Sequence, residues 1–411
     1  MSHIADLIVI GAGPAGLSAA VEAAQQGWRV IVLDEFPQPG GRILGQFHEE
    51  PGHGWWIGRH IATQLVDRAN TLGVIIRCGT SVHSVQWNED AGTWIARLPD
   101  ESLTGRYLLL ATGAAEVPTP VPGWTLPGVM SIGAAQVLTN VHYVKPGQRG
   151  LIIGVNVLSM AIARELSVSG VSLAGIVLPP SSSFATEAAQ PASVLHGMAK
   201  LAHLAPTPLL RAGGRLIKSP SSARLAARLL PRSGLKIWDI PLLLRTATVS
   251  INGREQVESV TVVDLDGRGG PLAATRRDLA VDFVALAGGL YPLAELAAVL
   301  GCPFVYVDEL GGHVPVHDEQ LRTPIPRLHV AGSITGVESA QVAIAQGALA
   351  ATSICADAGC FGLEGEARVR EAIGRVRAVR AAALIQFHPR ITAARERLYA
   401  DAGIASQAPT S

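Results

Sequence analysis

This sequence of 411 residues contains only four cysteines and has a formal net charge of zero. Its cysteines are too few and too scattered for a disulfide framework, which favours a reducing cytoplasm. Lys plus Arg equals Asp plus Glu at 33 each, so no excess of either sign indicates nucleic acid as a partner. The sequence has no run of about 20 uncharged apolar residues, so it predicts no transmembrane segment.

The sequence also lacks a basic leader and a metal-ligand motif. The first apolar run follows directly on Asp6, and we expect it to be a strand instead of a signal peptide. His48 and His53 are five residues apart, with Pro51 between them, whereas the zinc-protease motif places two His four apart on one helical face. We therefore expect no metal site. No side chain is identified as a general acid, base or nucleophile.

What the chain does contain is a β-α-β unit at its start. Residues 7–10 form an apolar run typical of a buried parallel strand, a helix follows as far as Gly27, and a second strand spans residues 30–33. Between the first strand and the helix stands a G-x-G-x-x-G motif made of Gly11, Gly13 and Gly16. An acid, Asp34, follows about 20 residues later, which completes the pattern of a dinucleotide-binding unit.

Each glycine of this motif has a physical task. Gly11 permits the tight turn between strand and helix. Gly13 lets the backbone approach a pyrophosphate, and Gly16 lets the helix pack closely on the strand. We therefore expect all three glycines to be needed at a dinucleotide site.

The helix N-terminus and the end of the second strand supply the polar groups. Pro14 and Ala15 begin the helix, where free N–H groups and a partial positive charge face the phosphates. Asp34, with Glu35 beside it, is expected to accept hydrogen bonds from the adenosine ribose.

A Pro/Gly-rich loop follows this unit. The paired glycines that end at Gly41 let a backbone approach a ligand, and Arg42 is placed to face phosphate or flavin. An ordinary turn is the alternative, but directly after a dinucleotide unit we favour the ligand role. Trp55 and Trp56 come next and are expected to lead a helix that continues through residues 62–69.

The chain then repeats its opening pattern over residues 150–170. Gly154 stands where Gly11 stands in the first unit, but Asn156 replaces the second glycine and Ser159 the third. The strand that follows ends in two prolines with no acid. Because a Cβ at position 156 obstructs a close approach to the backbone, we expect the fold of a dinucleotide unit without its phosphate chemistry.

The remaining patterns complete an α/β protein. We expect buried strands at residues 106–110, 280–287 and 328–331, an antiparallel pair at 246–250 and 257–265, and helices at 341–356 and 364–387. The sequence predicts two Rossmann-like domains, the second inserted in the first, and a C-terminal helical segment. The expected boundaries are 1–120 with 280–360 for the FAD-binding domain, 121–279 for the inserted NAD(P)-binding-like domain, and 361–411 for the helical tail.

Three blocks resemble the two-dinucleotide-domain flavoproteins related to thioredoxin reductase. They are the opening unit, LLLATGA at residues 108–114 and TPIPRLHVAGS at residues 323–333. The resemblance implies an FAD site completed by Val82, Thr112, Gly113, Gly332 and Ser333. Ser333 stands where that superfamily has an Asp, and is a weaker acceptor for the ribityl chain. The chain has no C-x-x-C pair, which excludes dithiol chemistry.

A narrower resemblance rests on LDEFPQPGGRI, DFVALAGGLYP, the degenerate second motif and the C-terminal helix. These features are similar to the α subunits of hetero-oligomeric FAD-dependent amino-acid and opine dehydrogenases, the family of opine oxidase, hydrogen cyanide synthase and D-hydroxyproline dehydrogenase. The resemblance implies a catalytic β subunit with its own FAD, which oxidises a proline-like, opine or glycine substrate. This chain would relay the electrons through FAD to an iron–sulfur or quinone acceptor.

Longer members of that family carry a cysteine-rich domain with an iron–sulfur cluster. Cys355 and Cys360 have a C-x₄-C spacing, but no C-x₂-C follows them, and Cys78 and Cys302 are distant. We therefore expect the [2Fe–2S] cluster on a small ferredoxin-like subunit. The arginine-rich helix after Glu364 is its candidate docking face.

Two other functions stay open at this point. One is a stand-alone NAD(P)H-dependent flavin or ferredoxin reductase, which the degenerate second unit argues against. The other is a non-catalytic structural flavoprotein subunit, which the intact first motif argues against. We expect a cytoplasmic protein, or one peripheral to the inner membrane through its partners.

Overall fold

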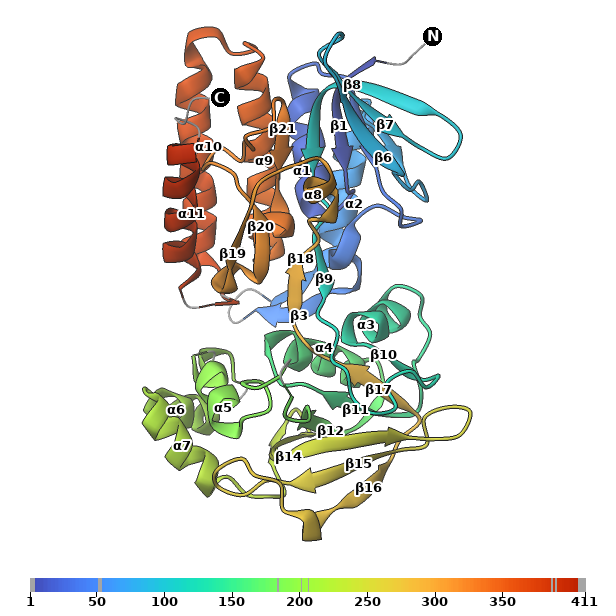
Figure 1. The fold of residues 1–411 in the computed structure, drawn as a ribbon, viewed down its shortest axis with the longest axis vertical. Helices are drawn as coiled ribbons and strands as arrows, with labels where there is room; N and C mark the ends of the chain where they lie inside the picture. The colour runs from blue at the N-terminus through green and yellow to red at the C-terminus, as the bar shows by residue number, and fades with distance from the viewer. Residues whose placement is uncertain are drawn as a thin grey trace. The chain divides into compact units, whose positions relative to one another are not determined.

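The computed structural model describes residues 4–50, 54–182, 185–200, 202–205, 207–385, 387–388 and 390–405 (Figure 1). Its contacts divide the chain into two compact units. Unit 1 comprises Met1–Leu44, Gly58–Ala115 and Leu290–Ser411, and unit 2 comprises Gly45–Ile57 and Glu116–Gly289. Unit 2 is therefore inserted in unit 1, and the α/β class that the sequence predicts is confirmed.

Unit 1 is built on a sheet whose order is β5-β2-β1-β8-β7-β6, with β21 also paired to β8. Its strands are β1 (Ile4–Ile10), β2 (Val30–Leu33), β5 (Ile75–Arg77), β6 (Ser84–Asn88), β7 (Thr93–Arg97), β8 (Ser102–Leu110) and β21 (Leu328–Val330). The four pairings among β1, β2, β5, β8 and β21 are parallel, which brings the carboxyl ends of these strands to one edge. In parallel α/β sheets that edge is where ligands bind.

The helices of unit 1 are α1 (Pro14–Gln25), α2 (Gly58–Thr71), α8 (Glu295–Val299), α9 (Ala340–Asp357), α10 (Gly365–Ala382) and α11 (Ile391–Ala405). α1 lies so close to α9 that a Cβ at Gly347 would be 2.0 Å from the carbonyl oxygen of Ala15. Small residues in both helices therefore permit this contact, as the sequence of α9 indicates. α11 has no counterpart among the predicted elements.

Smaller elements complete unit 1. They are the antiparallel pair β19 (Phe304–Val307) and β20 (Gly312–Pro315), and the pair β9 (Ala114–Glu116) and β18 (Leu290–Pro292). β9 leads out of unit 1 and β18 leads back into it along the chain. The inserted segment is thus longer at both ends than the predicted 121–279.

Unit 2 has a sheet of its own, with the order β10-β17-β11-β12-β14-β15-β16 and β13 beside β14. Its strands are β10 (Val129–Ser131), β11 (Arg149–Ile153), β12 (Ser172–Leu178), β13 (Leu235–Ile237), β14 (Ile240–Asn252), β15 (Ser259–Asp264), β16 (Arg277–Ala280) and β17 (Phe283–Leu286). Its helices are α3 (Ile132–Asn140), α4 (Val157–Val168), α5 (Pro191–Ala199), α6 (Pro208–Leu216) and α7 (Pro220–Leu229). β14 and β15 form the predicted antiparallel pair.

A hairpin of β3 (Phe47–Glu50) and β4 (Gly54–Ile57) also belongs to unit 2. The prediction that Trp55 and Trp56 begin a helix is wrong, because both lie in β4 and the helix begins at Gly58. Their side chains pair across the hairpin, where His48 stacks on Trp56. Among the described residues, no helix is both long and apolar enough to cross a membrane.

Candidate functional site

The glycine-rich turn after β1 has the geometry that its sequence predicts. Gly11 has a φ of +109°, and a Cβ there would lie 2.3 Å from the carbonyl oxygen of Ala111. A Cβ at Gly16 would lie 1.9 Å from the carbonyl oxygen of Gly11. Both glycines are therefore required by the fold of the turn itself, whether or not a ligand is bound.

Gly13 differs from these two glycines. Its φ of −77° suits any residue, and a Cβ there would meet no atom within 4 Å. Gly13 is the N-cap of α1, and no side chain caps this helix end. Pro14 has no N–H, so the first-turn donors are the backbone N–H groups of Ala15 and Gly16, and the positive end of the helix dipole lies behind them. This is the arrangement that receives a phosphate.

Asp34 stands at the end of β2 and closes the turn from the side. Its Oδ2 accepts a hydrogen bond from Ala12 N at 2.6 Å, and its Oδ1 accepts one from Phe36 N at 2.8 Å. This positioning role is absent from the sequence prediction, which assigns Asp34 only to the ribose. Each carboxylate oxygen has lone pairs to spare, so the ribose contact stays a prediction. Glu35 is exposed beside it.

The segment that contains Val82 passes the same strand end. Thr80 N donates a hydrogen bond to the carbonyl oxygen of Asp34 at 2.9 Å, two residues before Val82. The Val82 side chain packs against the apolar cluster around Trp94. The segment is thus placed near the expected ribose position by its backbone, and the side chain of Val82 faces the core.

The loop with Gly41 and Arg42 lies against the turn. A Cβ at Gly41, where φ is +59°, would be 2.9 Å from the Cα of Gly13. Gly40 N donates to the carbonyl oxygen of Ala12 at 2.8 Å. Arg42 Nε donates to the carbonyl oxygen of Ala114 at 3.0 Å, so it links this loop to the end of the LLLATGA block. The close approach that the paired glycines predict is therefore made to the turn itself.

The two remaining blocks meet at the same edge. Ala331 N donates to the carbonyl oxygen of Leu110 at 3.0 Å, which joins the end of β21 to the end of β8. A Cβ at Gly332 would lie 2.9 Å from the Cβ of Ala15, on the first turn of α1. Ser333 follows and is partly exposed. Thr112, on the other side, donates its hydroxyl to the carbonyl oxygen of Leu293.

Taken together, this edge fits the adenosine diphosphate half of FAD. The fit rests on a helix N-terminus that is open at Gly13 and on an acid held at the strand end. We expect backbone N–H groups at the start of α1 to hold the pyrophosphate and Asp34 to hold the ribose. Thr112-Gly113 and Gly332-Ser333 would flank the rest of the molecule.

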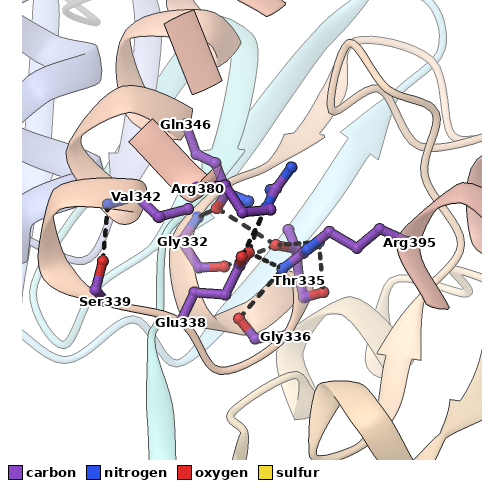
Figure 2. A network of polar contacts seen from close by, with 9 residues as sticks. All are labelled: Gly332, Thr335, Gly336, Glu338, Ser339, Val342, Gln346, Arg380 and Arg395. Atoms are coloured by element: carbon purple, nitrogen blue, oxygen red, sulfur yellow. Dashed lines mark hydrogen bonds and ion pairs between the residues drawn. The ribbon is translucent and has the colours of Figure 1, made fainter. Parts of the chain in front are cut away.

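A buried charge network that the sequence prediction misses lies behind Gly332 (Figure 2). Glu338 Oε1 accepts a hydrogen bond from Arg380 Nε at 2.6 Å, and Arg395 Nη2 is 2.5 Å from Glu338 Oε2. Arg395 is 1% exposed and also donates to the carbonyl oxygens of Thr335 and Gly336. The network therefore ties α10 and α11 to the segment between β21 and α9.

The same segment is held from α9. Gln346 Oε1 accepts a hydrogen bond from Gly332 N at 2.9 Å, and Thr335 donates its hydroxyl to the carbonyl oxygen of Gly332 at 2.8 Å. Burial raises the pKa of Glu338, but Arg395 and Arg380 lower it by more. The net pKa of this carboxyl is therefore below its ordinary value, and the carboxyl is ionised. No local sequence signal marks these partners, because Glu338 and Arg395 are 57 residues apart.

In the corresponding turn of unit 2, side chains of the turn occupy the N-terminus of the helix. Gly154 has a φ of +113°, and a Cβ there would lie 2.3 Å from the carbonyl oxygen of Ala287, as at Gly11 in unit 1. Asn156 is the N-cap of α4, and its Oδ1 accepts a hydrogen bond from Ser159 N at 2.9 Å. Its Nδ2 donates to Ala287 O, also at 2.9 Å. Side chains thus occupy the space that is open at Gly13.

Unit 2 also contains a buried carboxyl, Glu165 on α4. Its Oε2 accepts hydrogen bonds from Gln136 Nε2 at 2.6 Å and Asn140 Nδ2 at 3.0 Å, and its Oε1 accepts one from Phe47 N at 3.2 Å. Burial raises the pKa of Glu165 to about 8 in spite of these hydrogen bonds. The carboxyl therefore joins α3, α4 and the β3–β4 hairpin, and burial keeps it protonated up to a pH of about 8.

This pKa predicts that pH changes the stability of unit 2. Because the folded state holds a proton on Glu165 up to a pH of about 8, whereas an unfolded Glu loses it near the ordinary pKa of 4.5, stability falls as pH rises between these values. The slope approaches about 1.4 kcal/mol per pH unit. Thermal melts at several pH values should show a smaller loss for Glu165→Gln. Glu187→Gln, at an exposed carboxyl of unit 2, is the control, and equal slopes for all three proteins would contradict the assignment.

The helix after Glu364, which the sequence predicts as an arginine-rich docking face, does not present unpaired positive charge. Each arginine of α10 pairs with a carboxylate. The pairs are Arg368–Glu364, Arg370–Glu366, Arg375–Glu371, Arg377–Glu319 and Arg380–Glu338. The i to i+4 spacing of three of these pairs neutralises the helix surface, so charge no longer favours this helix as a docking face.

Among the described residues, no group of three or more His, Cys, Asp or Glu side chains is placed to hold a metal ion. His53 lies outside the described residues. The four cysteines are free, and Cys302 and Cys355 are buried. The chemistry that the geometry supports is therefore that of the nucleotide site in unit 1.

Comparisons with known proteins identify the family of this chain. A family model described as pyridine nucleotide-disulphide oxidoreductase matches residues 5–347. An opine oxidase subunit of Agrobacterium tumefaciens is 31% identical over 87% of this chain and 66% of its own length. Hydrogen cyanide synthase subunit HcnB of Pseudomonas aeruginosa is 25% identical over 84% of this chain and 70% of its own length. The resemblance to subunits of hetero-oligomeric flavoenzymes is thereby confirmed.

The fold has solved counterparts. Thioredoxin reductase of T. acidophilum matches with a TM-score of 0.61 and 20% sequence identity, over 87% of this chain and 99% of that one. At this identity the match supports the fold alone. The chain spans slightly less than two thirds of the opine oxidase subunit, at 66%.

Proposed function

The chain belongs to the pyridine nucleotide-disulphide oxidoreductase family, and we propose that it is the FAD-binding α subunit of a hetero-oligomeric dehydrogenase that oxidises an amino acid or an opine. The single observation that carries this proposal is the contrast between two equivalent helix ends. The N-terminus of α1 is open at Gly13, whereas the N-terminus of α4 is capped by Asn156. One nucleotide site is therefore expected, and it is in unit 1.

In this proposal the chain's own residues bind and orient. The first turn of α1 neutralises the pyrophosphate, and Asp34 fixes the ribose end. Gln346 and Thr335 hold the segment at Gly332 that flanks the site. Bound FAD would supply the ability to accept an electron pair and pass electrons on singly.

The substrate class and the partners come from the relatives. The names of the opine oxidase and hydrogen cyanide synthase subunits support a multi-subunit enzyme. We propose that it oxidises an opine, glycine or a proline-like amino acid, as the family resemblance implies. We propose a catalytic β subunit with a flavin of its own, and a small ferredoxin-like iron–sulfur subunit or a quinone as acceptor. The compartment proposed is the cytoplasm.

An anaerobic mixing experiment separates this proposal from a self-sufficient reductase. NADH and NADPH are expected to reduce FAD bound to this chain slowly, because Asn156 and Ser159 fill the helix end at which their pyrophosphate would bind. Absorbance at the flavin band after rapid mixing gives the rate, and dithionite provides the fully reduced reference. Bleaching within seconds at micromolar NADH would favour the reductase function.

Co-expression of this chain with the proteins encoded by neighbouring genes, followed by purification of the complex, tests the proposal itself. The chain alone should not reduce a dye with proline-like, glycine or opine substrates, and the complex should. A complex that contains Gly13→Val should elute at the same size but reduce the dye poorly, which separates an electron relay from a structural flavin. Full substrate-dependent dye reduction by the chain alone would refute its assignment as one part of a larger enzyme.

A further inference from the structure

One stretch of unit 2 has a marked imbalance of charge. Residues 188–238 contain no Asp or Glu, although the chain as a whole has 33. The same stretch contains eight Lys and Arg: Lys200, Arg211, Arg215, Lys218, Arg224, Arg228, Arg232 and Lys236. A charge of +8 is therefore concentrated here in a chain whose net charge is zero, and most of it lies on or beside α6 and α7.

α7 presents leucines to solvent on the side opposite its buried face. Ala223 and Ala227 are buried, whereas Leu225 and Leu229 are 60% and 76% exposed. At 100° per residue, the two leucines lie about half a turn away from the two alanines. Arg224, next to Leu225, is also exposed, so the outward face combines apolar side chains with a cation.

α6 has the same character. Leu209 and Leu216 are 81% and 76% exposed, and their spacing of seven residues places them on one side of the helix. The helix packs through another side, where a Cβ at Gly214 would lie 2.2 Å from the Cβ of Ala202. Arg211 and Arg215 are exposed around the same helix.

None of these cations forms an ion pair among the residues that the structure describes, although two of them bind backbone. Arg211 Nε donates to the carbonyl oxygen of Ala205 at 2.7 Å, and Arg228 Nε donates to that of Gly267 at 3.2 Å. Asp266 precedes Gly267, but its Oδ1 accepts hydrogen bonds from backbone N–H groups in its own turn. The positive charge of the stretch is therefore not cancelled locally.

In unit 2, α5, α6 and α7 lie together beside the sheet (Figure 1), and α5 packs on α7. We propose that the leucine–arginine face, formed by Leu209, Leu216, Leu225 and Leu229 with the cations of α6 and α7, docks on the surface of an anionic lipid bilayer. The leucines would enter the boundary between headgroups and acyl chains, and the arginines would contact lipid phosphates. This proposal does not depend on the flavin.

An acidic protein is the other class of partner that a basic face could fit. Protein interfaces are enriched in aromatic side chains, and their energetic centres seldom use Leu. α6 and α7 contain no Phe, Trp or Tyr. Helices of low net hydrophobicity that carry Leu on one side and Arg around it are instead typical of peripheral membrane binding.

Co-sedimentation of the full-length chain with vesicles tests the proposal. The protein should sediment with vesicles of phosphatidylcholine mixed with phosphatidylglycerol and not with pure phosphatidylcholine. Binding should fall by about tenfold or more in roughly 0.5 M salt, because salt screens the attraction between exposed charges. Failure to prefer the anionic vesicles would overturn the proposal, as would binding to an acidic protein partner without any to lipid.

Matched variants locate the face. Leu225→Gln with Leu229→Gln, and separately Arg224→Glu, should each reduce vesicle binding about tenfold while thermal melting stays near that of the wild type. Leu363→Gln, at a fully exposed leucine of unit 1, and Arg254→Glu, at an exposed arginine elsewhere in unit 2, should leave binding unchanged. Equal losses in the variants and their controls would show that the face is not the binding surface.

Discussion

Replacing Gly13 with Val is expected to empty the FAD site while the chain stays folded. The φ at this position suits a β-branched residue, and a Cβ there meets no protein atom within 4 Å. The space is therefore free for a ligand, and a Val side chain would fill it. The loss of two charge-assisted hydrogen bonds to the pyrophosphate would weaken FAD binding by about 100-fold or more.

Isothermal titration of the flavin-free protein with FAD measures this effect. Gly374→Val is the matched control, because Gly374 lies on α10 in unit 1 and has equally open space around its Cα. The control should bind FAD as the wild type does, and both variants should melt within a few degrees of it. Unchanged FAD affinity in Gly13→Val would place the nucleotide elsewhere.

The second large effect is expected on stability. Replacing Glu338 with Ala leaves Arg380 and Arg395 buried without their shared carboxylate. Removal of one partner from a buried ion pair costs about 3–5 kcal/mol, since the remaining charge is neither solvated nor compensated. The free energy of unfolding, measured by urea denaturation, should fall by this amount.

Glu319 provides the comparison, because it pairs with Arg377 on the same helix α10 at an exposed position. Glu319→Ala should cost less than about 1 kcal/mol, since water replaces the lost partner of an exposed arginine. Similar losses for the two variants would contradict the structural role of the buried network. A lowered FAD affinity in Glu338→Ala that remains under fully folded conditions would show in addition that the network positions the segment at Gly332.

The nucleotide unit can be predicted from the sequence because its requirements are local. Gly11 and Gly16 are dictated by contacts within one turn, and the spacing to Asp34 follows from the length of a single β-α-β unit. The degenerate second unit is predictable for the same reason. The structure adds that the Asn156 side chain accepts the hydrogen bond from the first turn of α4 that a bound phosphate would otherwise accept.

The parts that the sequence does not predict depend on long-range contacts. Glu338 and Arg395 meet only because α11, which sequence patterning does not identify, packs behind β20 and the segment at Thr335. The neutral surface of α10 depends only partly on such contacts. Glu319 and Glu338 are distant in the chain, whereas the other three acids stand four residues before their arginines, a spacing that the sequence itself displays. The β3–β4 hairpin escapes prediction because a Trp pair is compatible with helix and strand alike.

The most direct test of the FAD site in unit 1 is the flavin content of the purified full-length chain after incubation with FAD and removal of free ligand. We expect about one FAD per chain in the wild type and in Asn156→Gly, because the expected site is in unit 1 and the turn of unit 2 plays no part in it. We expect almost none in Gly13→Val. A wild-type chain that retains no FAD, or one whose FAD is lost in Asn156→Gly and kept in Gly13→Val, would contradict a FAD site at the start of α1.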